Sequence, residues 1–165
     1  MALIIDSHAH FEPRMLTEAD LLRKLDAAGV DKVALIPAMN DPLPPVPELM
    51  LSAVRLMMQS NLTRPIAEAA HRLTLTDEGN LRLVSGEYKI YPQPDNASAF
   101  ELVKRHPERF LSWAFLNPRA SAHVLEDLEK WRSHSGMIGV KLHPHWHDYT
   151  TDLLYPLFER MQELN

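Results

Sequence analysis

Short apolar runs of strand length alternate along this chain with stretches of helical periodicity. Residues 3–6 and 33–36 are two such apolar runs, and each is expected to form a buried strand. Between them lies a capping box at Thr17-Glu18-Ala19-Asp20, followed by apolar positions at helical spacing and by a stop signal at Gly29. A strand, a helix and a second strand in this order predict a βαβ unit with parallel strands.

The same alternation returns in the last third of the chain. Residues 110–116 and 137–143 are predicted strands. Helices are expected from an N-cap at Asn96, over 124–131 and over 153–164. The chain therefore predicts an α/β fold in which a βα unit is repeated about four times.

Residues from about 43 to 95 interrupt these repeats. Apolar spacing predicts helices around 49–57 and 66–73, and residues 88–94 are expected to form an ordered loop. A long insertion between βα units usually carries function or specificity. By location alone, three of its side chains are candidates for substrate specificity: Arg82, Tyr88 and Tyr91.

His8 and His10 come at the end of the first predicted strand. Side chains two residues apart on a strand project together, and two converging imidazoles can bind one divalent metal ion such as zinc. The alternative is that neighbouring backbone groups satisfy both rings, and the spacing leaves both interpretations open. Asp6 is expected on the same face, either to orient one imidazole or to cap a nearby turn.

A second polar group falls at the end of the strand predicted over 137–143. Gly139, Lys141 and His143 share one face of this strand, and the alternate positions form an apolar row suited to packing under helices: Ile138, Val140 and Leu142. Parallel barrels carry their chemistry at the C-terminal ends of the strands. Both polar groups would then open onto the same face.

Lys141 and His143 are the candidates in this second group for catalysis and for substrate binding, and His143 could instead complete the metal site. Lys141 could bind a substrate carboxylate or form an ion pair with an acidic side chain. His143 is favoured over His145 and His147, for which a proline-broken loop rich in histidine and aromatic groups is the simpler interpretation.

The loops after the second and third predicted strands add polar side chains at the same end: Asn40, Asp41, Asn117 and Arg119. Asn40, Asn117 and Arg119 are candidates to bind substrate. Turn formation is the stronger alternative for each, because Asn and Asp commonly precede Pro for backbone reasons.

Composition narrows the classes of function. The 165 residues are expected to form one domain, with a formal net charge of -5 and both signs interspersed. This argues against a nucleic-acid partner. The absence of cysteine excludes disulfides and thiolate ligands, so a metal would need His, Asp, Glu or a modified Lys. No apolar run approaches the ~20 residues of a membrane span, and no signal-peptide pattern is found. A cytoplasmic protein with a small-molecule substrate is expected.

Four segments together resemble the amidohydrolase superfamily. They are Ile4–Phe11 (IIDSHAHF), Ala28–Val33 (AGVDKV), His106–Phe110 (HPERF) and Gly139–Pro144 (GVKLHP). The chain is most similar to the branch that includes aminocarboxymuconate semialdehyde decarboxylase and dicarboxylate lactonases. The similarity runs over the whole chain and is weakest over 42–94.

The resemblance implies a distorted TIM-type (β/α)8 barrel with one or two divalent metals, usually zinc, bound by His8 and His10. It also implies histidines after the fifth and sixth strands and an aspartate after the eighth, which the four predicted βα units do not reach. Some members carry a carboxylated lysine on strand four, but a substrate or ion-pair role is favoured for Lys141, because this branch generally uses a single metal.

Together these expectations describe the N-terminal half of a metal-dependent barrel hydrolase. Metal-activated water would act on a small carboxylate-bearing substrate, by hydrolysis or by non-oxidative decarboxylation. The alternative is a non-catalytic half barrel that binds metal weakly or assembles with a partner, as a homo-oligomer or through another chain that covers its open sheet edges. A third interpretation is a compact α/β protein without metal.

Overall fold

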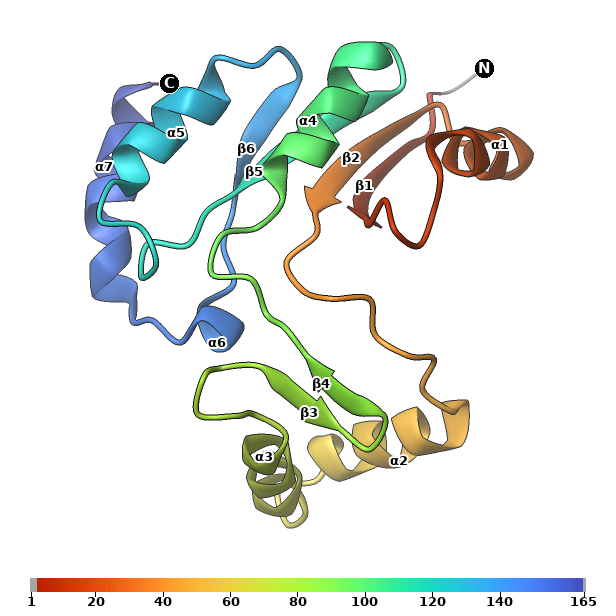
Figure 1. The fold of residues 1–165 in the computed structure, drawn as a ribbon, viewed down its shortest axis with the longest axis vertical. Coiled ribbons are helices and arrows are strands. Elements are labelled where there is room, and N and C mark those ends of the chain that lie inside the picture. Colours follow the sequence, from red (N-terminus) through yellow and green to blue (C-terminus); the bar gives the residue numbers. More distant parts are fainter. Residues whose placement is uncertain (1–2, 165) are drawn as a thin grey trace. The chain divides into compact units, whose positions relative to one another are not determined.

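The computed structural model describes residues 3–164, and its contacts divide the chain into two compact units (Figure 1). The sheet unit runs to Met39 and resumes at Tyr91, and the insertion unit is Asn40–Ile90. The expectation that residues 1–165 form one domain stays a prediction.

A four-stranded parallel sheet forms the centre of the sheet unit. Its strands are β1 (Ile5–Phe11), β2 (Lys32–Pro37), β5 (Phe110–Phe115) and β6 (Met137–Lys141), in the order β1-β2-β5-β6. This confirms the predicted parallel βα repeats. Among the described strands, β1 and β6 are the two edges of this sheet, as expected for half of a TIM-type barrel.

Helices follow the strands, most of them in the predicted places. They are α1 (Glu18–Ala28), α4 (Asn96–Arg105), α5 (Val124–Arg132), a short α6 (Pro144–His147), the 3-10 turn η1 (Thr151–Leu154) and α7 (Tyr155–Glu163). At the start of α1 the Thr17 side chain accepts from the Asp20 N–H at 3.2 Å, and Gly29 ends the helix with a φ of 66°. The predicted cap and stop signal are confirmed.

Two apolar clusters hold the helices against the sheet. One joins α1 and α4 to β2 and β5, and it includes Leu21, Leu25, Val33, Leu102 and Phe110. The other lies under α5 and α7, which are side by side in Figure 1 and are joined by an Arg160–Glu129 bond of 2.7 Å. Burying each such side chain stabilises the fold by about 1.5–3 kcal/mol.

The edge strands are more exposed than predicted. Residues 3–6 were expected to be a buried strand, yet Ile4 and Ile5 are 53% and 50% exposed, and β1 extends through both histidines to Phe11. Ile138 in the expected apolar row of β6 is 41% exposed. The reason is that the described residues place a neighbouring strand on only one side of β1 and of β6.

The start of α4 also differs from the prediction. Asp95, not Asn96, caps this helix by accepting from the Ser98 N–H at 3.2 Å. Asn96 is buried, and its side-chain amide donates to the Phe115 carbonyl at 2.8 Å and accepts from the Phe115 N–H at 2.7 Å. Its amide therefore satisfies the backbone at the end of β5.

The insertion unit contains α2 (Glu48–Gln59) and α3 (Arg64–Leu73), as predicted, and a hairpin of β3 (Leu81–Leu83) and β4 (Gly86–Tyr88) that was not predicted. Strands of three residues are too short to show a period in the sequence. Within residues 3–164, no helix is both long and apolar enough to cross a membrane.

Candidate functional site

The two histidines of β1 project together near the C-terminal end of the strand. The ring centroids of His8 and His10 are 5.2 Å apart, with an interplanar angle of 64°. Ala9 and Phe11, at the alternate positions, pack against the apolar cluster of α1 and α4. His8 and His10 therefore face the side of the sheet opposite to these helices.

Asp6 does not share this face, because β1 contains a bulge. Asp6 pairs with Val33 and Ala9 pairs with Leu35, so one extra residue of β1 lies between the two pairs. An extra residue reverses the alternation of side chains. The expected shared face is therefore wrong for Asp6, whose carboxylate accepts from the backbone N–H of His8 at 2.9 Å.

Charged groups from both edge strands act on His10. Crowding by neighbouring atoms lowers the pKa of His10 below its ordinary value, although its side chain is still reached by solvent. Positive charge on His8, Lys141 and His143 lowers this pKa further. The consequence is a neutral imidazole at neutral pH, which is the form that binds a metal ion.

His143 lies just beyond β6 rather than within it. The strand ends at Lys141, and the Nδ1 of His143 accepts from the backbone N–H of Trp146 at 3.2 Å, at the start of α6. The segment expected as a proline-broken loop is thus a short helix that begins with Pro144. Since Nδ1 accepts a hydrogen bond, the neutral ring carries its proton on Nε2.

His147 is buried beside this group. Its Nε2 lies 3.3 Å from the carbonyl oxygen of Tyr91, and its ring centroid is 5.7 Å from that of Phe115. Burial lowers the pKa of His147, the Tyr91 carbonyl opposes this shift, and positive charge on His143 adds to it. The side chain of His145 lies outside the described residues.

His8 and His10 suit a metal ion as a pair of ligands. Two imidazoles bound tetrahedrally to one zinc, with Zn–N distances near 2.0–2.1 Å, have ring centres roughly 5 Å apart, as these two rings do. However, residues 3–164 contain no group of three or more His, Asp or Glu side chains placed to hold a metal. A complete coordination shell would therefore need ligands beyond this pair.

Two loop residues with predicted substrate roles are engaged in structural contacts. Asn117 is 5% exposed; its amide donates to the Pro92 carbonyl at 2.9 Å and accepts from the Arg119 N–H at 3.1 Å. Arg119 forms an ion pair with Asp148. These contacts match the turn-forming alternative, and the substrate roles stay predictions.

The remaining candidates belong mostly to the insertion unit. Asn40 donates to the Asp41 carbonyl at 2.7 Å, and the Asp41 carboxylate accepts from the Lys89 N–H at 2.9 Å. The hydroxyl of Tyr88 lies 2.9 Å from that of Ser85, and Arg82 lies in β3. Tyr91, in contrast, belongs to the sheet unit.

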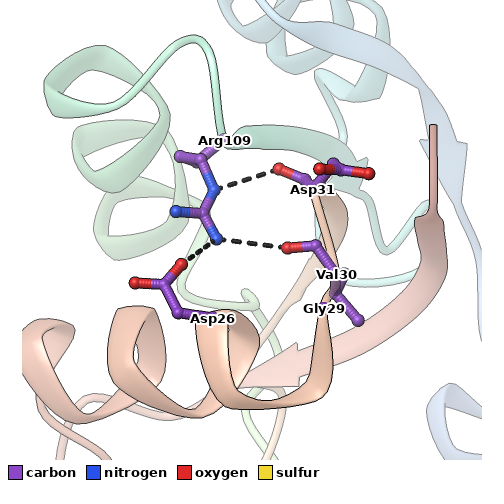
Figure 2. A pocket seen from close by; sticks show the side chains of 5 residues that line it. All are labelled: Asp26, Gly29, Val30, Asp31 and Arg109. Carbon is purple, nitrogen blue, oxygen red and sulfur yellow. Dashed lines mark hydrogen bonds and ion pairs between the residues drawn. The ribbon is translucent and has the colours of Figure 1, made fainter. Parts of the chain in front are cut away.

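The residues that line a pocket at the N-terminal ends of β2 and β5 make structural contacts. The pocket is lined by residues that precede β2 and β5, with Asp26 and Gly29 from the end of α1 (Figure 2). Arg109 donates to the carbonyl oxygens of Val30 and Asp31 at 3.1 and 3.0 Å and pairs with Asp26 at 2.8 Å. Its guanidinium thus links the segment before β5 to the segment before β2.

The fold and the histidine pair define the class of this protein as a barrel-type α/β domain with a candidate metal site at the C-terminal end of its strands. The chain belongs to the amidohydrolase family, because the family model described as Amidohydrolase matches residues 5–165. Membership supports a function of the metal-dependent hydrolase type and a TIM-type barrel as the parent fold. A search of curated proteins gives no match.

Proposed function

We propose that this chain carries part of the metal and substrate site of a metal-dependent hydrolase that acts on a small carboxylate-bearing substrate. The observations that support it are the close approach of the His8 and His10 rings and the effect of the charges of Lys141 and His143 on the pKa of His10. The C-terminal ends of parallel strands are where barrel enzymes place their chemistry.

Each of these side chains has a role that its surroundings support. His8 and His10 would hold one divalent ion, most simply zinc, and the low pKa of His10 keeps its ring available at neutral pH. When bound, the ion supplies a Lewis acid that activates water and polarises a carbonyl. Lys141 would supply a positive charge for a substrate carboxylate.

His143 would position the substrate beside Lys141. This role is supported by its position, because His143 comes two residues after Lys141, directly beyond the end of β6. Hydrolysis at a carbonyl centre and non-oxidative decarboxylation both use such a cationic pocket next to a metal.

A second function is favoured by the incomplete ligand set. With two histidines as the described ligands and two open sheet edges, the chain would bind metal weakly until a partner supplies further ligands. That partner would be a second copy or another chain that covers β1 and β6.

Zinc titration against a competing chromophoric chelator separates these proposals. We expect one zinc per chain for the parent protein, no specific binding for His8→Ala/His10→Ala, and parent-like binding for the control His123→Ala, whose exposed imidazole lies on a helix end. Affinity that rises with protein concentration would favour assembly with a second copy. Equal affinity in the parent and the double variant would contradict the metal site.

The carboxylate role of Lys141 has its own test. The zinc-loaded protein is assayed on a small ester that carries a carboxylate and on its carboxamide analogue. Lys141→Met is expected to raise KM about tenfold or more for the carboxylate, since a charged hydrogen bond contributes about 1.5–3 kcal/mol, and to leave the analogue unchanged. An equal effect on both substrates would contradict this role.

A further inference from the structure

The candidate site depends on two strands that do not pair with each other. His8 and His10 come from β1, while Lys141 and His143 come from the end of β6, and these are the opposite edges of the described sheet. Strand pairing fixes each edge only through β2 and β5. Some other contact must hold the two edge segments in register at the C-terminal end of the sheet.

The segment Tyr91–Asp95 lies at this end and bonds to the central strands. The Tyr91 N–H donates to the Met39 carbonyl at 2.8 Å, and the Asp95 N–H donates to the Ala38 carbonyl at 2.8 Å, just after β2. After β5, the side chain of Asn117 donates to the carbonyl of Pro92 at 2.9 Å.

Tyr91 also reaches the residues that follow both edge strands. After β1, Arg14 donates to the Tyr91 hydroxyl, and its guanidinium lies 5.8 Å from the centroid of the tyrosine ring. Arg14 is itself oriented by Glu12, with two bonds of 2.8 Å to the carboxylate. After β6, the imidazole of His147 is bonded to the Tyr91 carbonyl.

We propose that Tyr91–Asp95 is a cross-tie over the C-terminal ends of all four strands, and that Tyr91 is a positioning residue of the candidate site. Its hydroxyl holds the segment after β1, and its carbonyl holds α6, which His143 begins. The cross-tie thereby sets how far the histidines of β1 lie from Lys141 and His143. Its importance for metal binding rests on the proposed function, but its effect on geometry does not.

A distance measurement on the metal-free protein tests the cross-tie. The chain has no cysteine, so Met15→Cys and Thr150→Cys, both at exposed positions after β1 and after α6, accept spin labels selectively. Pulsed electron spin resonance should give one narrow distance distribution in the parent. Tyr91→Phe and Arg14→Gln, which each remove the hydroxyl contact, should both lose that narrow distribution in favour of a broader or shifted one.

Tyr88→Phe is the matched control. It removes a tyrosine hydroxyl that contacts Ser85 within the insertion unit, so the distance should stay as in the parent. Arg14 is half exposed, so Arg14→Gln tests the contact even if Tyr91→Phe unfolds the chain. A parent-like distribution in Arg14→Gln, or a change as large in Tyr88→Phe, would overturn the inference.

Zinc titration of the same variants separates the cross-tie from the proposed function. Outer partners of metal sites typically change affinity about 10–100-fold, and we expect the lower end for Tyr91→Phe. A changed distance with parent-like zinc affinity would support the cross-tie and count against the proposed metal site. A parent-like distance would overturn the cross-tie whatever the zinc result.

Discussion

The two ends of the parallel sheet differ in how their charges are used. Where β2 and β5 begin, opposite charges and carbonyl groups meet: Arg109 binds two carbonyls and Asp26, and Glu18 pairs with both Arg105 and His106. Where β1 and β6 end, the charged groups that shift the pKa of His10 are all of one sign. The first arrangement stabilises the fold, whereas the second is proposed to bind a ligand.

The four segments that resemble the amidohydrolase superfamily divide between these ends. Ala28–Val33 and His106–Phe110 meet at the strand entries, where Arg109 of one segment binds Val30 and Asp31 of the other (Figure 2). Ile4–Phe11 and Gly139–Pro144 supply the histidines and the lysine at the strand exits. The segments that carry the family resemblance therefore include both structural residues and residues of the candidate site, and their contacts distinguish the two kinds.

Arg109→Met should have the largest effect on stability. It leaves two backbone carbonyls and Asp26 without their charged donor, so we expect the free energy of unfolding to fall by about 3 kcal/mol. Urea denaturation measures this loss. Arg105→Met, which removes an exposed partner of Glu18, is the control and should cost only a fraction as much. Equal losses would contradict the structural role assigned to Arg109.

The pH dependence of stability should be determined in part by the histidines at the C-terminal ends of the strands. The pKa values of His10 and His147 are lowered from the ordinary 6.5, so the unfolded chain binds more protons than the folded chain just below that pH. The free energy of unfolding should therefore fall as the pH is lowered through about 6.5. His10→Gln should reduce this slope, and His123→Gln, at an exposed helix end, should not. An unchanged slope in His10→Gln would be inconsistent with the crowding around His10.

Lys141→Met should have the smallest effect on stability. This variant tests whether the C-terminal ends of the strands depend on charge for stability. Removing this charge relieves repulsion at His10, so the free energy of unfolding should stay within about 1 kcal/mol of the parent or rise. Urea denaturation without metal measures it. A loss as large as that of Arg109→Met would show that the strand exits also depend on charge for stability.

Much of the fold could be predicted because its signals are local. Thr17 and Gly29 mark the ends of α1 through hydrogen bonding and backbone geometry that depend on near neighbours. The apolar runs of β2 and β5 coincide with strands whose residues are mostly buried. In contrast, the exposure of β1 depends on which strands lie beside it, which no local pattern records.

The candidate site was less predictable, because its geometry depends on long-range contacts. The spacing of His8 and His10 predicted their shared face, but the bulge that turns Asp6 away is visible only in the pairing with β2. Asn96 looked like a helix cap, whereas its amide satisfies Phe115, which lies 19 residues further along the chain. Nothing in the sequence around Tyr91 indicated that it contacts residues after both edge strands.

The C-terminal ends of β1 and β6 are proposed to bind a metal rather than to stabilise the metal-free fold. The most direct test is urea unfolding of the parent and of His8→Ala/His10→Ala, each with and without zinc. At a free zinc concentration of about 100 times Kd, zinc should raise the unfolding free energy of the parent by about 2.7 kcal/mol and leave the double variant unchanged. Equal stabilisation of both proteins, or of neither, would contradict the claim.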